Sequence, residues 1–85
     1  MKRAIALRYD ADVAERHGAP LVVSSGEGDL ADRIARAARD YGVPVVYDVP
    51  LALALSELAE GDAIPESLYE PVAAILWALG GGSEA

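Results

Sequence analysis

The chain has 85 residues, a net charge of −7 and no cysteine, which fits one small domain and excludes disulfides, thiolate nucleophiles and thiolate metal sites. A single histidine, His17, is too few for a histidine-based zinc site, and no apolar run approaches the roughly 20 residues that cross a bilayer. We therefore expect a cytoplasmic protein without cofactor or metal. Its second half, residues 40–85, holds eight acids and no base, which argues against a nucleic-acid partner.

Two strands are predicted in the first third of the chain. Residues 4–9 (AIALRY) alternate between two faces and predict a first strand. Residues 10–20 are mostly polar and predict a connection between the two strands. Residues 21–25 form a short, nearly continuous apolar run, which is typical of a strand covered on both faces.

A helix and a third strand are predicted next. Asp29 is the expected N-cap of the helix, and its apolar residues recur at helical spacing up to Tyr41. Gly42 and Pro44 end the helix, and residues 45–47 (VVY) predict the third strand. A strand, helix and strand in succession predict a parallel, right-handed unit over residues 21–48.

The last third is expected to be helical. Pro50 fits the first turn of a helix over residues 51–59, and a third helix spans residues 64–79. This helix has a core seam and an adjoining apolar stripe that either packs against protein or offers a docking surface. The stripe consists of Tyr69, Ala73 and Leu76. The fold class is therefore α/β: one domain, with a small three-stranded parallel or mixed sheet flanked by three helices.

One motif suggests a nucleotide site. Gly26, Gly28 and Ala31 follow a strand at the spacing G-x-G-x-x-A, and Asp48 lies about 20 residues further on. Glu27 and Asp29 lie within this loop and would repel a pyrophosphate. The glycines are better explained by a tight turn from strand to helix. A small-ligand or nucleotide-binding α/β protein that uses the Gly26–Gly28 loop remains the alternative hypothesis.

Four segments together resemble a known family. They are AIALRYD (4–10), APLVVSSGEGDLADRIARAARDYGVPVV (19–46), PLALAL (50–55) and IPESLYEPVAAIL (64–76). In this order and spacing they resemble the cytoplasmic domain of the FlhB/YscU family, the substrate-specificity switch proteins of flagellar and injectisome type III secretion. The resemblance implies an FlhB C-terminal-like domain over residues 1–79, with residues 80–85 (GGGSEA) as a flexible tail.

The resemblance also implies what the chain does not do. In the family, the segment like AIALRYD follows an Asn-Pro-Thr-His loop that cleaves itself. Met1 and Lys2 stand at the positions of its Thr and His, so we expect neither autocleavage nor another enzymatic activity. We expect a stand-alone relative without the family's membrane domain. Leu53 replaces a basic residue of the family, so a contact that needs positive charge there is not expected.

The partners implied by the resemblance are export substrates or export-gate proteins. The family binds a short hydrophobic segment of early rod and hook subunits on an apolar patch whose residues match Ala19, Pro20, Ala73 and Leu76. Ordinary core packing of these residues is the competing interpretation. A regulatory role, in competition with full-length FlhB for its N-terminal part, is a further alternative. Because cut members keep a strand from before the cut, we expect an open sheet edge here, available to a partner or to a second copy.

Overall fold

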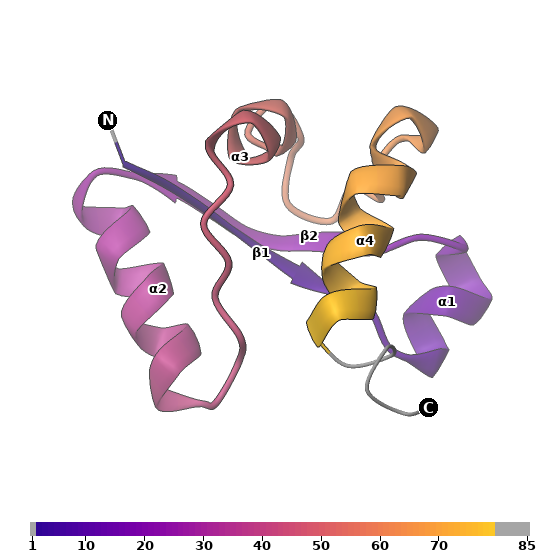
Figure 1. The fold of residues 1–85 in the computed structure, drawn as a ribbon, viewed down its shortest axis with the longest axis horizontal. Coiled ribbons are helices and arrows are strands. Elements are labelled where there is room, and N and C mark those ends of the chain that lie inside the picture. The colour runs from indigo at the N-terminus through magenta and orange to yellow at the C-terminus, as the bar shows by residue number, and fades with distance from the viewer. Residues whose placement is uncertain (1, 80–85) are drawn as a thin grey trace.

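A computed structural model describes residues 2–79 as a mixed α/β domain (Figure 1). Along the chain lie β1 (Arg3–Arg8), α1 (Ala11–His17), β2 (Leu21–Glu27), α2 (Asp29–Asp40), α3 (Val49–Leu55), the 3-10 turn η1 (Glu66–Leu68) and α4 (Tyr69–Leu79). The expected tail, residues 80–85, lies outside the described residues. None of the helices found in residues 2–79 is long and apolar enough to cross a membrane.

The sheet consists of β1 and β2, which pair antiparallel from Arg3 opposite Glu27 to Arg8 opposite Leu21, with a bulge after Ala6. The far edge of β2 is partly covered by the chain before η1. There the N–H of Val22 donates to the carbonyl of Asp62 (2.9 Å), and the N–H of Gly61 donates to the carbonyl of Val22 (2.7 Å).

The α/β class is confirmed, but the three-stranded parallel or mixed sheet is not. Residues 45–47 form no strand, and the sheet of the described chain has two antiparallel strands. The segment has the β-branched composition of a strand. However, a strand also needs a neighbouring segment to which its backbone can hydrogen-bond. Within the described chain, residues 45–47 make no backbone hydrogen bond on either side. Residues 2–79 also contain four α-helices instead of the three expected.

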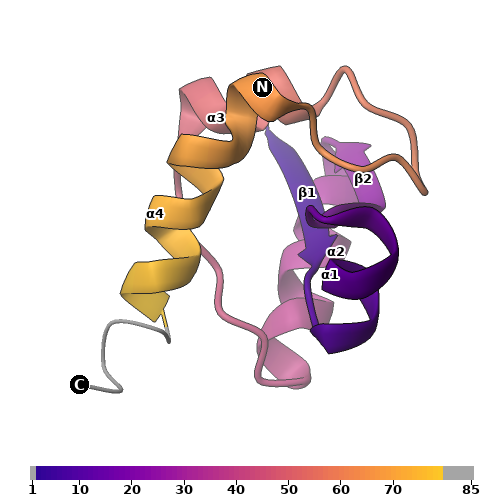
Figure 2. The same ribbon diagram turned by 90° about the vertical axis from the view of Figure 1, so that its right-hand side faces the viewer.

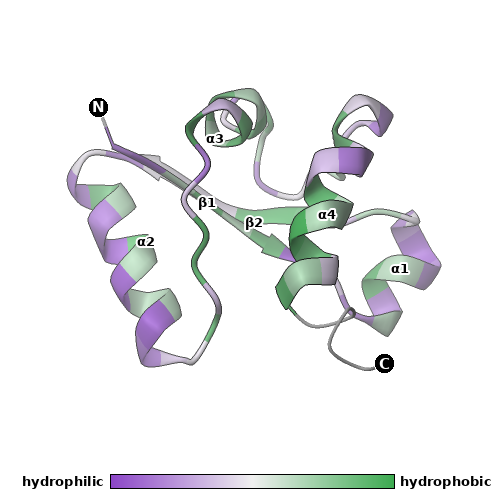
Figure 3. Ribbon diagram, viewed as in Figure 1, coloured by the Kyte–Doolittle hydropathy of each residue, from purple (hydrophilic) through white to green (hydrophobic). Residues whose placement is uncertain are grey.

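Helices cover both faces of the sheet. On one face, Ile5 and Leu7 pack against the buried core, which is made by Ala19, Leu51, Leu55, Ile64 and Val72. The helix α2 packs against both strands, and none of its residues belongs to that core, so it covers the other face, where Ala31 is buried. In Figure 3, α2 carries alternating polar and apolar surfaces, whereas α3 and α4 are mainly apolar.

The helix α1 replaces the polar connection expected over residues 10–20. Its start is fixed by Asp10, whose carboxylate accepts a hydrogen bond from the N–H of Val13 (2.9 Å). Its end is fixed by Gly18, which has a φ of 69° and donates its N–H to the carbonyl of Ala14 (2.9 Å). This left-handed conformation favours glycine. Both capping residues were visible in the sequence, but a single buried residue, Val13, gives so short a helix no apolar periodicity.

The remaining boundaries differ from the expected ones by a few residues. The N-cap of α2 is Gly28, and Asp29 is the first helical residue. The helix expected over 51–59 begins at Val49, because Asp48 caps it through the N–H of Leu51 (3.1 Å), and ends at Leu55. The helix expected over 64–79 is divided into η1 and α4.

Candidate functional site

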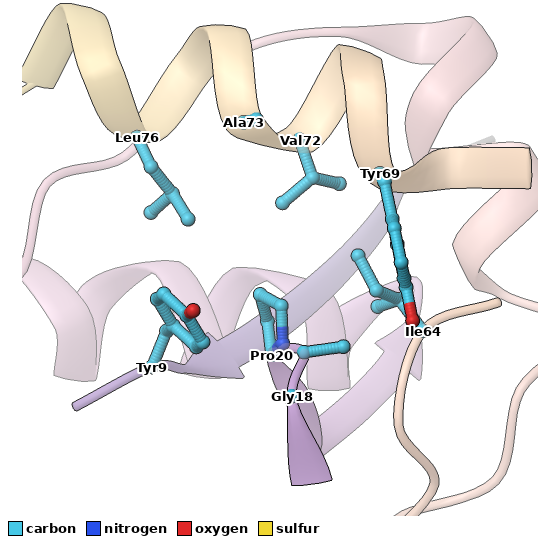
Figure 4. Close-up of a pocket in the computed structure, with 9 residues that line it drawn as sticks. Tyr9, Gly18, Pro20, Ile64, Tyr69, Val72, Ala73 and Leu76 are labelled. Carbon is cyan, nitrogen blue, oxygen red and sulfur yellow. The ribbon is translucent and has the colours of Figure 1, made fainter. Parts of the chain in front are cut away.

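An apolar groove of about 190 Å³ lies between α4 and the chain that follows α1 (Figure 4). The same helix crosses in front of this chain in Figure 1 and lies at the left in Figure 2. The lining residues come from the end of β1, the end of α1, the chain before η1, and α4. They are Tyr9, Gly18, Ala19, Pro20, Ile64, Tyr69, Val72, Ala73 and Leu76.

The floor of the groove belongs to the core. Ala19, Ile64 and Val72 are each only 2% exposed. The N–H of Ile64 donates a hydrogen bond of 3.0 Å to the carbonyl of Pro20, so the two chain segments of the floor are held together. A floor that is packed and hydrogen-bonded keeps its shape without a ligand.

One wall of the groove is a face of α4. Tyr69, Val72, Ala73 and Leu76 follow the i, i+3, i+4, i+7 spacing, which brings them to one side of a helix. Val72 points into the core, Leu76 is half-buried and Ala73 is exposed. The surplus apolar stripe predicted for this helix therefore borders the groove instead of being covered completely.

Two tyrosines stand at the rim. Tyr9 is 48% exposed and Tyr69 is 41% exposed, and Figure 4 shows Tyr9 below Leu76 and Tyr69 beside Ile64. A tyrosine presents a flat apolar ring and a polar hydroxyl, which suits a boundary between an apolar floor and water.

Charged side chains order the turn that carries Tyr9 to α1. The Arg8 guanidinium donates to the Asp10 carboxylate at 2.8 Å, and Arg16 pairs with Asp12 at 2.9 Å. The N–H of Val13 and then the Arg8 hydrogen bond lower the pKa of Asp10. The hydrogen bond and charge of Asp10 raise the pKa of Arg8. The Arg8–Asp10 contact links the end of β1 to the N-cap of α1, and α1 leads into Gly18, Ala19 and Pro20.

The groove has few side chains that could serve acid–base catalysis or bind a metal ion. Its lining includes no carboxylate, amine, imidazole or thiol, and residues 2–79 contain no cluster of His, Cys, Asp or Glu that could hold a metal ion. What it presents is an apolar surface of fixed shape with two hydroxyl groups at its edge. Such a surface favours contact with apolar groups over charged ones.

The structure brings together all four predicted site residues. Ala19 and Pro20 lie on one side of the groove, and Ala73 and Leu76 lie on the other, more than 50 positions later in the chain. Ala19 and Pro20 are buried, so the core-packing interpretation fits them, whereas Ala73 is accessible. The sequence does not mark Tyr9 and Gly18 as site residues, because they fall in the predicted strand over residues 4–9 and the predicted connection over residues 10–20.

The glycines of the alternative nucleotide loop have structural roles. A Cβ atom at Gly26 would collide with the side chain of Leu30, and Gly28 has a φ of 60° and a ψ of −128°, which a side chain would strain. Glu27 pairs with Arg3 at 2.6 Å. Both glycines are thus explained by the turn from β2 into α2.

Comparison with known proteins identifies the relatives of this fold. The FlhB HrpN YscU SpaS family matches residues 1–79. The chain belongs to this family. The YlqH protein of Bacillus subtilis (strain 168) is 40% identical over 75 residues, which are 88% of this chain and 77% of YlqH. FlhB of Aquifex aeolicus (strain VF5), a flagellar biosynthetic protein, is 40% identical over 74 residues, 86% of this chain but only 20% of FlhB.

Among solved structures, the PscU C-terminal domain is similar to this one. It has a TM-score of 0.82 to this structure at 34% identity, over 93% of this chain and 98% of that one. Family membership supports a role related to type III protein export. Because the chain spans a fifth of the Aquifex FlhB, the activity and partners of the longer relatives do not pass to it directly.

Proposed function

We propose that the protein is a non-enzymatic binding module of type III export, whose groove holds a short apolar segment of an export substrate. The observation that carries the proposal is the meeting of Ala19 and Pro20 with Ala73 and Leu76 around one apolar groove. Its place of action would be the cytoplasm, where export substrates are presented.

The size of the groove favours side chains over a small-molecule cofactor. Its volume of about 190 Å³ is below the roughly 300 Å³ at which pockets for drug-sized ligands begin. One or two apolar side chains of a peptide fit such a volume. The hydroxyls of Tyr9 and Tyr69 at the rim would hydrogen-bond to the backbone of the bound peptide.

The charge of the chain suggests which peptides are preferred. Residues 40–85, which include α4, carry eight acids and no base. Charges of one sign near an interface favour partners of the opposite sign and repel acidic ones. Substrate segments with basic residues beside the apolar core should therefore bind faster than neutral or acidic segments, and the difference should shrink in high salt.

The proposal is tested with a matched pair of substitutions on α4. Ala73 and Ala74 are both exposed, but only Ala73 lines the groove. In titrations with peptides that carry the hydrophobic recognition segment of rod and hook subunits, Ala73→Asp should weaken binding at least tenfold. Ala74→Asp should keep the affinity of the original chain.

Three results would count against the proposal. Equal binding by both variants would show that the peptide lies elsewhere. A rise in melting temperature with nucleotides and none with peptides would favour a ligand site at Gly26–Gly28. If the detached N-terminal part of FlhB is captured even by Leu76→Asp, while substrate peptides bind neither form, the chain is a competitor of FlhB and not a substrate receptor.

A further inference from the structure

The helix α4 is apolar on more sides than the rest of the domain covers. Residues 71–79 (PVAAILWAL) have no charged side chain, and most of this helix is green in Figure 3. Val72 is buried, and Ile75 and Leu76 are half-buried and pack against the core cluster. A helix that is apolar all round normally has protein on every side. The side of α4 turned away from the core instead leaves apolar surface in water.

This outer face of α4 is formed by Ala74, Trp77 and Ala78. The spacing i, i+3, i+4 places them side by side on the helix, all three are exposed, and none of them lines the groove. Trp77 is 67% exposed although it is the largest apolar side chain of the chain. The helix lies in front of the sheet in Figure 1 and to the left of it in Figure 2, so no described element covers it on that side.

The charges at one end of the outer face have a single sign. Glu66 in η1 and Glu70 in the first turn of α4 lie toward the N-terminal end of the face, and both are exposed. Glu70 precedes Ala74 by four positions, so the two are neighbours on the helix surface. Within residues 2–79, neither glutamate belongs to an ion pair. The outer face is therefore apolar along most of its length and acidic at its start.

We propose that the outer face of α4 docks a helix of another protein, which is apolar along one stripe and basic in its last turn. Such a helix would run antiparallel to α4, because its basic end then lies beside Glu66 and Glu70. Lysine and arginine in the last turn also interact favourably with the macrodipole of their own helix. The small side chains of Ala74 and Ala78 allow a close approach of the two helices, and the ring of Trp77 would be covered by the apolar stripe.

The same charges disfavour two other occupants of this face. A second copy would bring together two chains that each carry a net charge of −7, and such chains repel each other. The negative surface potential of a membrane attracts basic segments, whereas residues 40–85 contain no base. Charge complementarity thus favours a basic helix.

Trp77 provides the measurement, because tryptophan emission moves to shorter wavelength when the indole ring leaves water and the chain has a single tryptophan. The full chain is titrated with the capped peptide Ser-Leu-Gln-Gln-Leu-Leu-Gln-Ala-Leu-Gln-Lys-Leu-Leu-Lys-Lys, which forms a leucine stripe as a helix and is basic at its C-terminal end. This lysine peptide should shift the emission. It should bind about tenfold more tightly than a peptide with glutamate in place of each lysine, and the difference should shrink in high salt.

A matched pair of substitutions locates the binding surface. Ala74 and Ala37, on α2, are both exposed, and Ala74→Arg and Ala37→Arg change the net charge equally. Only Ala74→Arg places a positive charge beneath the peptide, so it should weaken binding about tenfold, whereas Ala37→Arg should preserve the affinity. Tyr9→Ala alters the rim of the groove and should also preserve it. Circular dichroism checks that each variant keeps the fold.

Several results would overturn the proposal. Equal affinity for the lysine and glutamate peptides, or equal weakening by the two arginine variants, would exclude a charge-matched helix at this face. Loss of binding in Tyr9→Ala would place the peptide in the groove. A shifted emission of the chain alone that is lost on dilution would show that a second copy covers Trp77. A shift with phosphatidylglycerol vesicles and with neither peptide would assign the face to a membrane. Substrate peptides are absent from these titrations, so failure here is distinct from failure of the proposed function.

Discussion

The hydrogen bond from the N–H of Ile64 to the carbonyl of Pro20 (3.0 Å) joins the two segments that form the floor of the groove. Ile64 is 2% exposed and packs within the main core cluster. The same residue thus supports both the stability of the domain and the shape of its candidate site.

Shortening the side chain at this position should destabilise the protein. Ile64→Ala should lower the free energy of unfolding by about 2 to 5 kcal/mol, because it removes buried methylene groups and leaves a cavity. Ile64→Val should cost about 1 kcal/mol and keep the fold. Urea unfolding followed by circular dichroism measures both, and Leu79→Ala, at a 45% exposed position, is the control and should cost less than either.

The end of α1 is expected to depend on glycine. A Cβ atom at Gly18 would meet nothing within 4 Å, so the cost of Gly18→Ala comes from its φ of 69° alone. We expect a loss of about 1 kcal/mol in the free energy of unfolding. Asn tolerates the left-handed conformation better, so Gly18→Asn should recover part of the loss in the same measurement; identical losses for the two variants would contradict this explanation.

Stability should fall in acid through Asp10. The N–H of Val13 and the Arg8 guanidinium lower the pKa of this carboxyl below its ordinary value of 3.8. A group whose pKa is lower in the folded state stabilises the protein above the unfolded-state pKa. That contribution is lost as the pH falls below 3.8 and through the folded-state pKa.

The variant Asp10→Asn isolates this effect, because asparagine keeps an oxygen that can accept from Val13 but does not titrate. The free energy of unfolding is measured between about pH 5 and pH 2.5 for both chains. The original chain should lose more stability than the variant over this interval. Parallel curves would show that Asp10 is not responsible.

Some helices and strands of the fold could be predicted from the sequence, and others could not. The strands β1 and β2, the helix α2 and its end near Gly42 follow from apolar periodicity and turn residues, which are local properties. The segment 45–47 has the same local properties as a strand but remains unpaired, since pairing depends on a neighbour that local sequence does not specify. The helix α1 was missed because one buried residue, Val13, gives no periodic pattern.

The candidate site was predicted from resemblance to a family, and not from a motif. Ala19 and Ala73 are among the most ordinary residues in a protein, and neither their type nor their spacing points to binding. Only the surplus apolar stripe on α4 indicated, from the chain itself, that one side of this helix would remain uncovered. Tyr9 joins the groove because β1 ends beside α4, which is a consequence of the tertiary fold.

Chemical-shift mapping shows whether the groove between residues 18–20 and α4 binds an apolar peptide segment. The isotope-labelled full chain is titrated with a peptide that carries the hydrophobic recognition segment of a rod or hook subunit. The largest shifts are expected at Gly18, Ala19, Tyr69, Ala73 and Leu76, and replacing the apolar residues of the peptide with Asp should abolish them. Shifts confined to the loop around Gly26 and Gly28, or to other surfaces outside the groove, would contradict peptide binding in the groove.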